Sequence, residues 1–136
     1  MAALCRPGPN AGASLIHSEN PHFWQIIDKL VATANVVIDR PKGSSHPRYP
    51  GYTFPFDYGY LEGTTAADGQ GIDVWIGSLE AGATAVVCTV DLVKSDAELK
   101  ILLGCSPEEI QTIHKDHNTS NNAGLLILRP QQETQQ

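Results

Sequence analysis

The chain has 136 residues, of which 41% are hydrophobic and 18% are charged, and these values predict one soluble globular domain. Its net charge of −6 argues against a nucleic-acid partner, since a basic face supplies most of the affinity there, and no apolar segment approaches the ~20 residues that cross a bilayer. Three cysteines without a CxxC pair argue against a disulfide scaffold and favour a reducing, cytoplasmic location.

Two helices are predicted from their capping signals and their apolar spacing. An N-terminal arm (residues 1–19) precedes the first, which is expected at 21–33 because Asn20 can cap it and a proline follows at the first helical position. Apolar residues then recur at three- and four-residue spacing. The second helix is expected at 107–117, where Ser106 is the cap and two glutamates lie near the positive end of the helix dipole.

Short strands are predicted for most of the remaining chain. Small β-proteins avoid open sheet edges by closing into a barrel. The element count therefore favours a mostly β domain (residues 20–130) with flanking helices around a five-stranded closed barrel, followed by a disordered tail (131–136). The expected strands lie at 36–39, 54–60 (extended around a turn), 72–76, 83–93, 98–103 and 123–128.

The stretch 54–76 is the first candidate for chemistry. Asp73 lies within an apolar run, where a carboxylate is costly to bury unless a cation or hydrogen-bond network meets it. Simple alternatives exist nearby: Asp68 precedes a glycine, as in a common turn pair, and Glu98 and Lys100 are typical of a solvent-facing pair. Four histidines have no partner at metal spacing and are interpreted as surface residues: His17, His22, His46 and His117.

This stretch resembles the signature region of the soluble inorganic pyrophosphatases with an OB-type barrel. Those enzymes carry an aromatic-Pro-x-Asn-Tyr-Gly-aromatic run and then an Asp-x-Asp-Pro-x-Asp motif. The corresponding segments here are FPFDYGY (54–60) and DGQGID (68–73), and the similarity extends over residues 36–115. The resemblance implies an OB-like barrel, a homo-oligomer, and hydrolysis of pyrophosphate to two phosphates with Mg²⁺, or Mn²⁺, as the cofactor.

The resemblance also implies a metal site and a catalytic group. Asp68 and Asp73 match the outer acids of the metal motif, and Gln70 stands where the family has the middle acid, which helps to activate the attacking water. Glutamine cannot take up that proton. The implied catalytic positions are Asp73, Gln70 and Tyr58. The implied metal ligands are Asp68, Asp73, Asp96 and Glu98, with Asp91 as the alternative to Asp96.

Phosphate contacts are implied by the same comparison. Lys100 follows the last acid by two residues on a strand, so both side chains should lie on the same face. The implied phosphate-binding residues are Arg48, Tyr58, Lys100 and Lys115. Asp39 stands where the family has a glutamate, and His114 where it has a tyrosine.

Three functions are compatible with these residues. The first is Mg²⁺-dependent pyrophosphate hydrolysis by a metal-activated water. The second is hydrolysis of another phosphoanhydride or phosphoester, because the family's β-hairpin is missing at residues 49–52 and a more open pocket would accept a larger substrate. The third is a catalytically weak metal- or phosphate-binding protein, because Gln70 replaces an acid.

Overall fold

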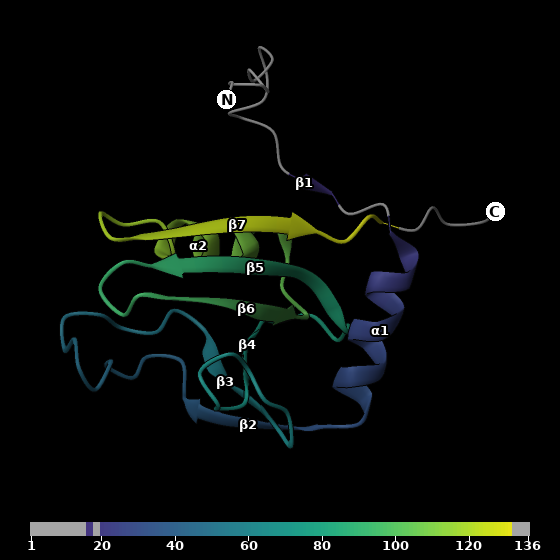
Figure 1. Ribbon diagram of the computed structural model, residues 1–136, viewed down its shortest axis with the longest axis horizontal. Helices are drawn as coiled ribbons and strands as arrows, with labels where there is room; N and C mark the ends of the chain where they lie inside the picture. The colour runs from purple at the N-terminus through teal and green to yellow at the C-terminus, as the bar shows by residue number, and fades with distance from the viewer. Residues whose placement is uncertain (1–15, 18–19, 132–136) are drawn as a thin grey trace, which may run out of the picture.

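A computed structural model describes residues 16–17 and 20–131, which form one mostly β domain with two helices on a mixed sheet (Figure 1). The strands are β1 (Ile16–His17), β2 (Asn35–Arg40), β3 (Asp57–Glu62), β4 (Ile72–Ile76), β5 (Ala83–Asp91), β6 (Asp96–Leu103) and β7 (Asn122–Leu128). The helices are α1 (Pro21–Ala32) and α2 (Pro107–Asp116). Neither of these helices is long and apolar enough to cross a membrane.

The sheet differs from the predicted five-stranded closed barrel. It has seven strands in the order β1-β7-β5-β6-β4-β3-β2. The additional strand β1 pairs in parallel with β7 and lies in the segment predicted as an arm, whose other residues (1–15 and 18–19) are outside the described part, as are 132–136 of the tail. No pairing among the described strands joins β1 to β2, so closure of the barrel is not confirmed.

The third strand begins later than the sequence predicts. Pro55 cannot donate to a strand ladder, and the regular pairing of β3 with β4 starts only at Asp57. The preceding segment instead pairs with itself through a bridge between Ser45 and Thr53. This self-paired loop after β2 becomes one wall of the cleft described below.

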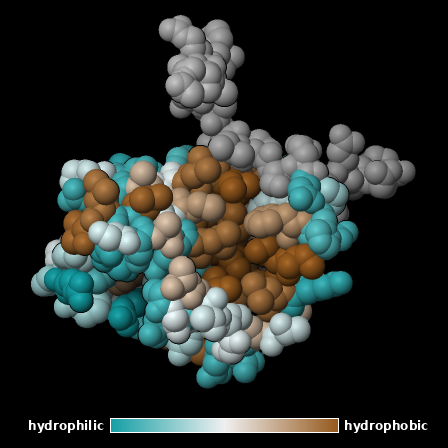
Figure 2. All heavy atoms as spheres, viewed as in Figure 1, coloured by the Kyte–Doolittle hydropathy of each residue, from teal (hydrophilic) through white to brown (hydrophobic). Residues whose placement is uncertain are grey.

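Helix α1 covers one face of the sheet. Asn20 caps it as predicted, because its side chain accepts the backbone N–H groups of His22 and Phe23. Trp24 and Ile27 are buried on the side that meets the sheet. Figure 2 shows hydrophobic side chains gathered on this face, where α1 meets strands β5, β6 and β7.

Helix α2 packs against the opposite face. Ser106 and Glu109 form a capping box, with 3.2 Å between Glu109 N and Ser106 Oγ and 2.8 Å between Ser106 N and Glu109 Oε1. Ile110 and Ile113 are buried in a cluster that includes Trp75 of β4. The packing leaves the C-terminal end of α2 beside the self-paired loop.

Candidate functional site

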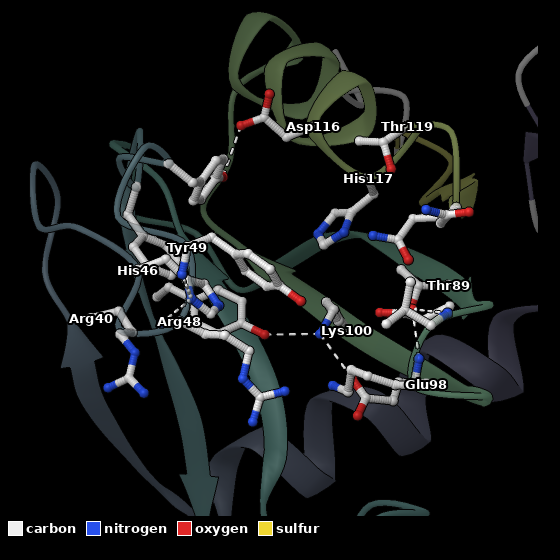
Figure 3. Close-up of a pocket in the computed structure, with 18 of the residues that line it drawn as sticks. Arg40, His46, Arg48, Tyr49, Thr89, Glu98, Lys100, Asp116, His117 and Thr119 are labelled. Carbon is white, nitrogen blue, oxygen red and sulfur yellow. Dashed lines mark hydrogen bonds and ion pairs between the residues drawn. The ribbon is translucent and has the colours of Figure 1, made fainter.

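A cleft of about 1060 Å³ lies on the α2 side of the sheet (Figure 3). The loop after β2 supplies His46, Arg48 and Tyr49 to one side, and Asp116 and His117 lie at the end of α2 on the other. Strands β3 to β6 contribute the floor between them. The cleft is therefore built from segments that are far apart in the sequence.

Lys100 is the centre of the floor. Its Nζ atom donates to Tyr58 Oη at 2.8 Å and lies 2.9 Å from both Asp73 Oδ2 and Glu98 Oε1. Lys100 is buried, with 7% of its surface exposed, so these charges are largely withdrawn from water. The structure thus brings together four of the residues that the resemblance implied.

The position of Tyr58 depends on Gly59, the residue that follows it. A Cβ atom on Gly59 would lie 1.8 Å from the carbonyl oxygen of Val37 in β2. Strand β2 can therefore approach β3 only because residue 59 is glycine. This close approach fixes the strand that carries Tyr58.

Burial and mutual contact set the protonation states on the floor. Burial alone would lower the pKa of Lys100, but the oxygens of Tyr58 and Asp73 more than offset it and raise the pKa. Burial raises the pKa of the Tyr58 hydroxyl, which keeps its proton. Burial also raises the pKa of Glu98, although Lys100 opposes this effect. The floor therefore holds a permanent cation between two carboxyl groups and a neutral hydroxyl.

The acids implied as metal ligands are each held by other partners. Asp73 and Glu98 are both engaged by Lys100. Asp96 lines the cleft but lies 3.6 Å from Lys94 Nζ. Its alternative, Asp91, accepts the backbone N–H groups of two residues in the turn after β5.

The remaining metal-motif residues lie in an exposed loop. Asp68 Oδ1 accepts the backbone N–H of Gln70 at 2.9 Å, and this bond lowers the pKa of Asp68, with a smaller contribution from a side-chain hydrogen bond with Glu98. Neither residue lines the cleft. Within residues 16–17 and 20–131, no group of three or more His, Cys, Asp or Glu side chains could hold a metal ion. These side chains do not fit a preformed magnesium centre in this arrangement.

His46 organises the loop wall and is partly exposed there, so its prediction as a surface residue holds in part. Its Nδ1 atom accepts the backbone N–H groups of Arg48 at 3.0 Å and Tyr49 at 3.2 Å. Burial lowers the pKa of His46, and the charges of Arg40 and Arg48 lower it further. The neutral ring therefore places Arg48 and Tyr49 beside the cleft.

His117 organises the opposite wall and is largely buried, so its prediction as a surface residue is wrong. Trp75 Nε1 donates to His117 Nε2 at 3.1 Å, and burial lowers the pKa of His117 to about 4. Asp116, the last residue of α2, accepts a 2.9 Å hydrogen bond from the hydroxyl of Tyr52. These two bonds join the end of α2 to the floor and to the loop.

Three further implied site residues lie outside the cleft lining, in addition to Asp68, Gln70 and Asp73. Lys115 is exposed on α2, and Asp39 is exposed on β2 with Arg40 at 3.7 Å. His114 Nε2 lies 3.0 Å from the carbonyl oxygen of Gly124 and links α2 to β7. The structure does not bring these three further side chains to the group around Lys100.

Sequence reasoning missed several residues that line the cleft. For the loop wall, the clustering of aromatic and cationic residues between β2 and β3 was an available signal. For the end of α2 there was no local signal, because only tertiary packing brings it to the cleft. The missed lining residues include Arg40, Tyr49, Tyr52, Asp116 and His117.

Comparisons with known proteins address the fold. No protein-family model matches the chain, and no curated protein sequence matches it significantly. Among solved structures, an inorganic pyrophosphatase from Helicobacter pylori matches with a TM-score of 0.50 and 17% identity, over 67% of this chain and 79% of that chain. One from Coxiella burnetii matches with a TM-score of 0.44 and 14% identity, over 67% of this chain and 81% of that chain. The chain has a pyrophosphatase-like fold.

Proposed function

We propose that the cleft binds inorganic pyrophosphate and hydrolyses it to two phosphates, with magnesium entering as part of a magnesium–pyrophosphate substrate. One observation carries this proposal: the buried ammonium of Lys100 faces the cleft, together with the Tyr58 hydroxyl. Arg48 lines the same cleft from the loop wall. Cations and hydroxyl donors of this kind are the groups that hold phosphoryl oxygens.

The proposed reaction is attack of water on one phosphorus atom. A P–O bond forms, the bridging P–O bond breaks, and the two protons of the water pass to the phosphate products. The protein contributes charge and position to this step: Arg48 faces the phosphoryl oxygens, and Lys100, whose three N–H groups contact Tyr58, Asp73 and Glu98, adds positive charge from the floor. No described carboxylate is free of a partner at the floor, so slow turnover is expected.

Arg48 provides the first test of phosphate binding. Replacing Arg48 with glutamine should weaken pyrophosphate binding about tenfold, since a charge-assisted hydrogen bond contributes about 1.5–3 kcal/mol and 1.4 kcal/mol corresponds to a factor of ten. Calorimetric titration in Mg²⁺-containing buffer measures the change. The matched control is Lys29→Gln on the exposed side of α1, which should bind like the unmodified protein. Equal affinities for the Arg48 and Lys29 variants would remove Arg48 from the proposal.

Phosphate release from pyrophosphate provides the test of hydrolysis. Because Gln70 does not line the cleft, Gln70→Asp should leave the rate of phosphate release unchanged: the new carboxylate can take up a proton, but it lies away from the phosphates at Lys100 and Arg48. Phosphate release is measured with Mg²⁺ or Mn²⁺, and Lys100→Met, which loses the cation that lines the cleft, serves as the inactive reference. If pyrophosphate binds but neither the unmodified protein nor the Gln70 variant exceeds this reference, the cleft is a phosphate-binding site and not an active site.

A further inference from the structure

The cleft is larger than pyrophosphate requires. Pockets that enclose drug-sized ligands have volumes of about 300–1,000 Å³, and this cleft has about 1060 Å³. The two phosphoryl groups of pyrophosphate would occupy only the part around Lys100 and Arg48. The rest of the cleft can accept an organic group attached to the phosphates.

Aromatic rings line the part of the cleft beyond the phosphate groups. His46 and Phe54 are stacked with centroids 5.8 Å apart and an interplanar angle of 12°, and Tyr49 follows at 5.0 Å from His46. Phe54 is buried, whereas Tyr49 at the outer end of this series is 52% exposed. A half-exposed tyrosine beside a cleft offers a ring face on which a planar base can stack.

The position of Tyr49 links this ring to the phosphate groups. Tyr49 follows Arg48 directly, and the same nitrogen of His46 accepts the backbone N–H of both residues. Figure 3 shows Tyr49 and Arg48 on one wall, Lys100 at the floor and Thr119 on the opposite wall. Thr119 and Asn121 also line the cleft and carry polar side-chain atoms that a sugar or a base edge can contact. One ligand can therefore contact a cation and the tyrosine ring together.

We propose that the cleft takes a nucleoside 5′-diphosphate or 5′-triphosphate, with the base stacked on Tyr49 and the phosphates at Arg48 and Lys100. This inference rests on the proposed function, because both use the same phosphate-binding groups. It identifies the substrate class: water then cleaves a phosphoanhydride bond of the nucleotide, releasing either phosphate or pyrophosphate, and the two protons of the water pass to the products.

Titration calorimetry with ADP, UDP and pyrophosphate, in the same Mg²⁺-containing buffer, tests the inference. ADP should bind about fivefold to 150-fold more tightly than pyrophosphate, because stacking of a base on an aromatic side chain contributes about 1–3 kcal/mol. UDP should also bind more tightly than pyrophosphate, since stacking is tolerant of base identity. Tyr49→Ala should reduce the ratio of ADP affinity to pyrophosphate affinity about tenfold, and Tyr49→Phe should preserve it. The matched control is Leu79→Ala, a similarly exposed apolar residue outside the cleft lining.

The outcomes separate this inference from the proposed function. If pyrophosphate binds but ADP binds no more tightly, the nucleotide inference is wrong and the phosphate site stands. The same conclusion follows if Tyr49→Ala leaves the affinity ratio unchanged. If neither ligand binds, the proposed function fails and the inference fails with it. A fall in the ratio for Tyr49→Ala, with the ratio kept in Tyr49→Phe and Leu79→Ala, supports base stacking.

Discussion

Replacing Lys100 with methionine is expected to lower the free energy of unfolding by about 3–5 kcal/mol, the cost of breaking a buried ion pair by removing one partner. Methionine keeps the length of the side chain but leaves Asp73 and Glu98 close together without their shared cation. The two like charges then repel each other, and the anionic ligand loses its main attraction. Urea denaturation measures the stability, and calorimetry should detect no pyrophosphate binding.

The loss should depend on the charge of the carboxylates. Burial raises the pKa of Glu98, and its protonation removes the repulsion, so the deficit of the Lys100 variant should be smaller at about pH 5 than at about pH 8. Adding Glu98→Gln to the variant should recover part of the lost stability. The matched control is Lys94→Met, which breaks a 3.6 Å surface pair with Asp96 and should cost less than about 1 kcal/mol. A deficit below that value for Lys100→Met would contradict a buried cation at the floor.

Acidification is expected to weaken the fold through His117. Its pKa falls from 6.5 in the unfolded chain to about 4 in the folded protein, so the unfolded state binds more protons between these values and stability decreases as the pH falls. A shift of this size corresponds to about 2–3 kcal/mol after allowance for the partial exposure of the ring. This contribution is complete above about pH 7 and lost at about pH 4. Urea denaturation across this pH range measures it.

The variant His117→Gln isolates this contribution from those of the carboxylates. Glutamine still offers an oxygen to Trp75 Nε1 but does not titrate. The variant should lose about 2–3 kcal/mol less stability than the unmodified protein on acidification. His22→Gln on the exposed side of α1 should follow the unmodified protein. Parallel pH curves for the unmodified protein and His117→Gln would show that this histidine does not couple protonation to folding.

The helices and most strands were predictable because their signals are local. Asn20 and Ser106 cap the two helices where the sequence indicates, and alternating or continuous apolar runs mark β4, β5, β6 and β7. Strand β1 was not predictable, since two residues carry no period and their pairing with β7 depends on contact between the two ends of the chain. The start of β3 was misplaced because the loop before it forms its own bridge.

The group around Lys100 was partly predictable. The two-residue spacing of Glu98 and Lys100 on a strand predicts a common face, and their 2.9 Å contact confirms it. Aspartate is disfavoured in strand interiors, so the sequence also indicated Asp73 as a candidate site residue. The wall at the end of α2 was not predictable, because the burial of His117 depends on a helix end that meets the rest of the cleft only in the folded protein.

The ammonium of Lys100 has a consequence for metal ions that approach the floor. It is attached to the same chain as Asp73 and Glu98, so its effective concentration at these carboxylates is set by the fold and does not fall on dilution. A dissolved divalent cation must compete with this tethered cation, whereas a magnesium ion already bound to a polyphosphate needs no carboxylate from the protein. The floor would then bind a magnesium–polyphosphate complex in preference to a free magnesium ion.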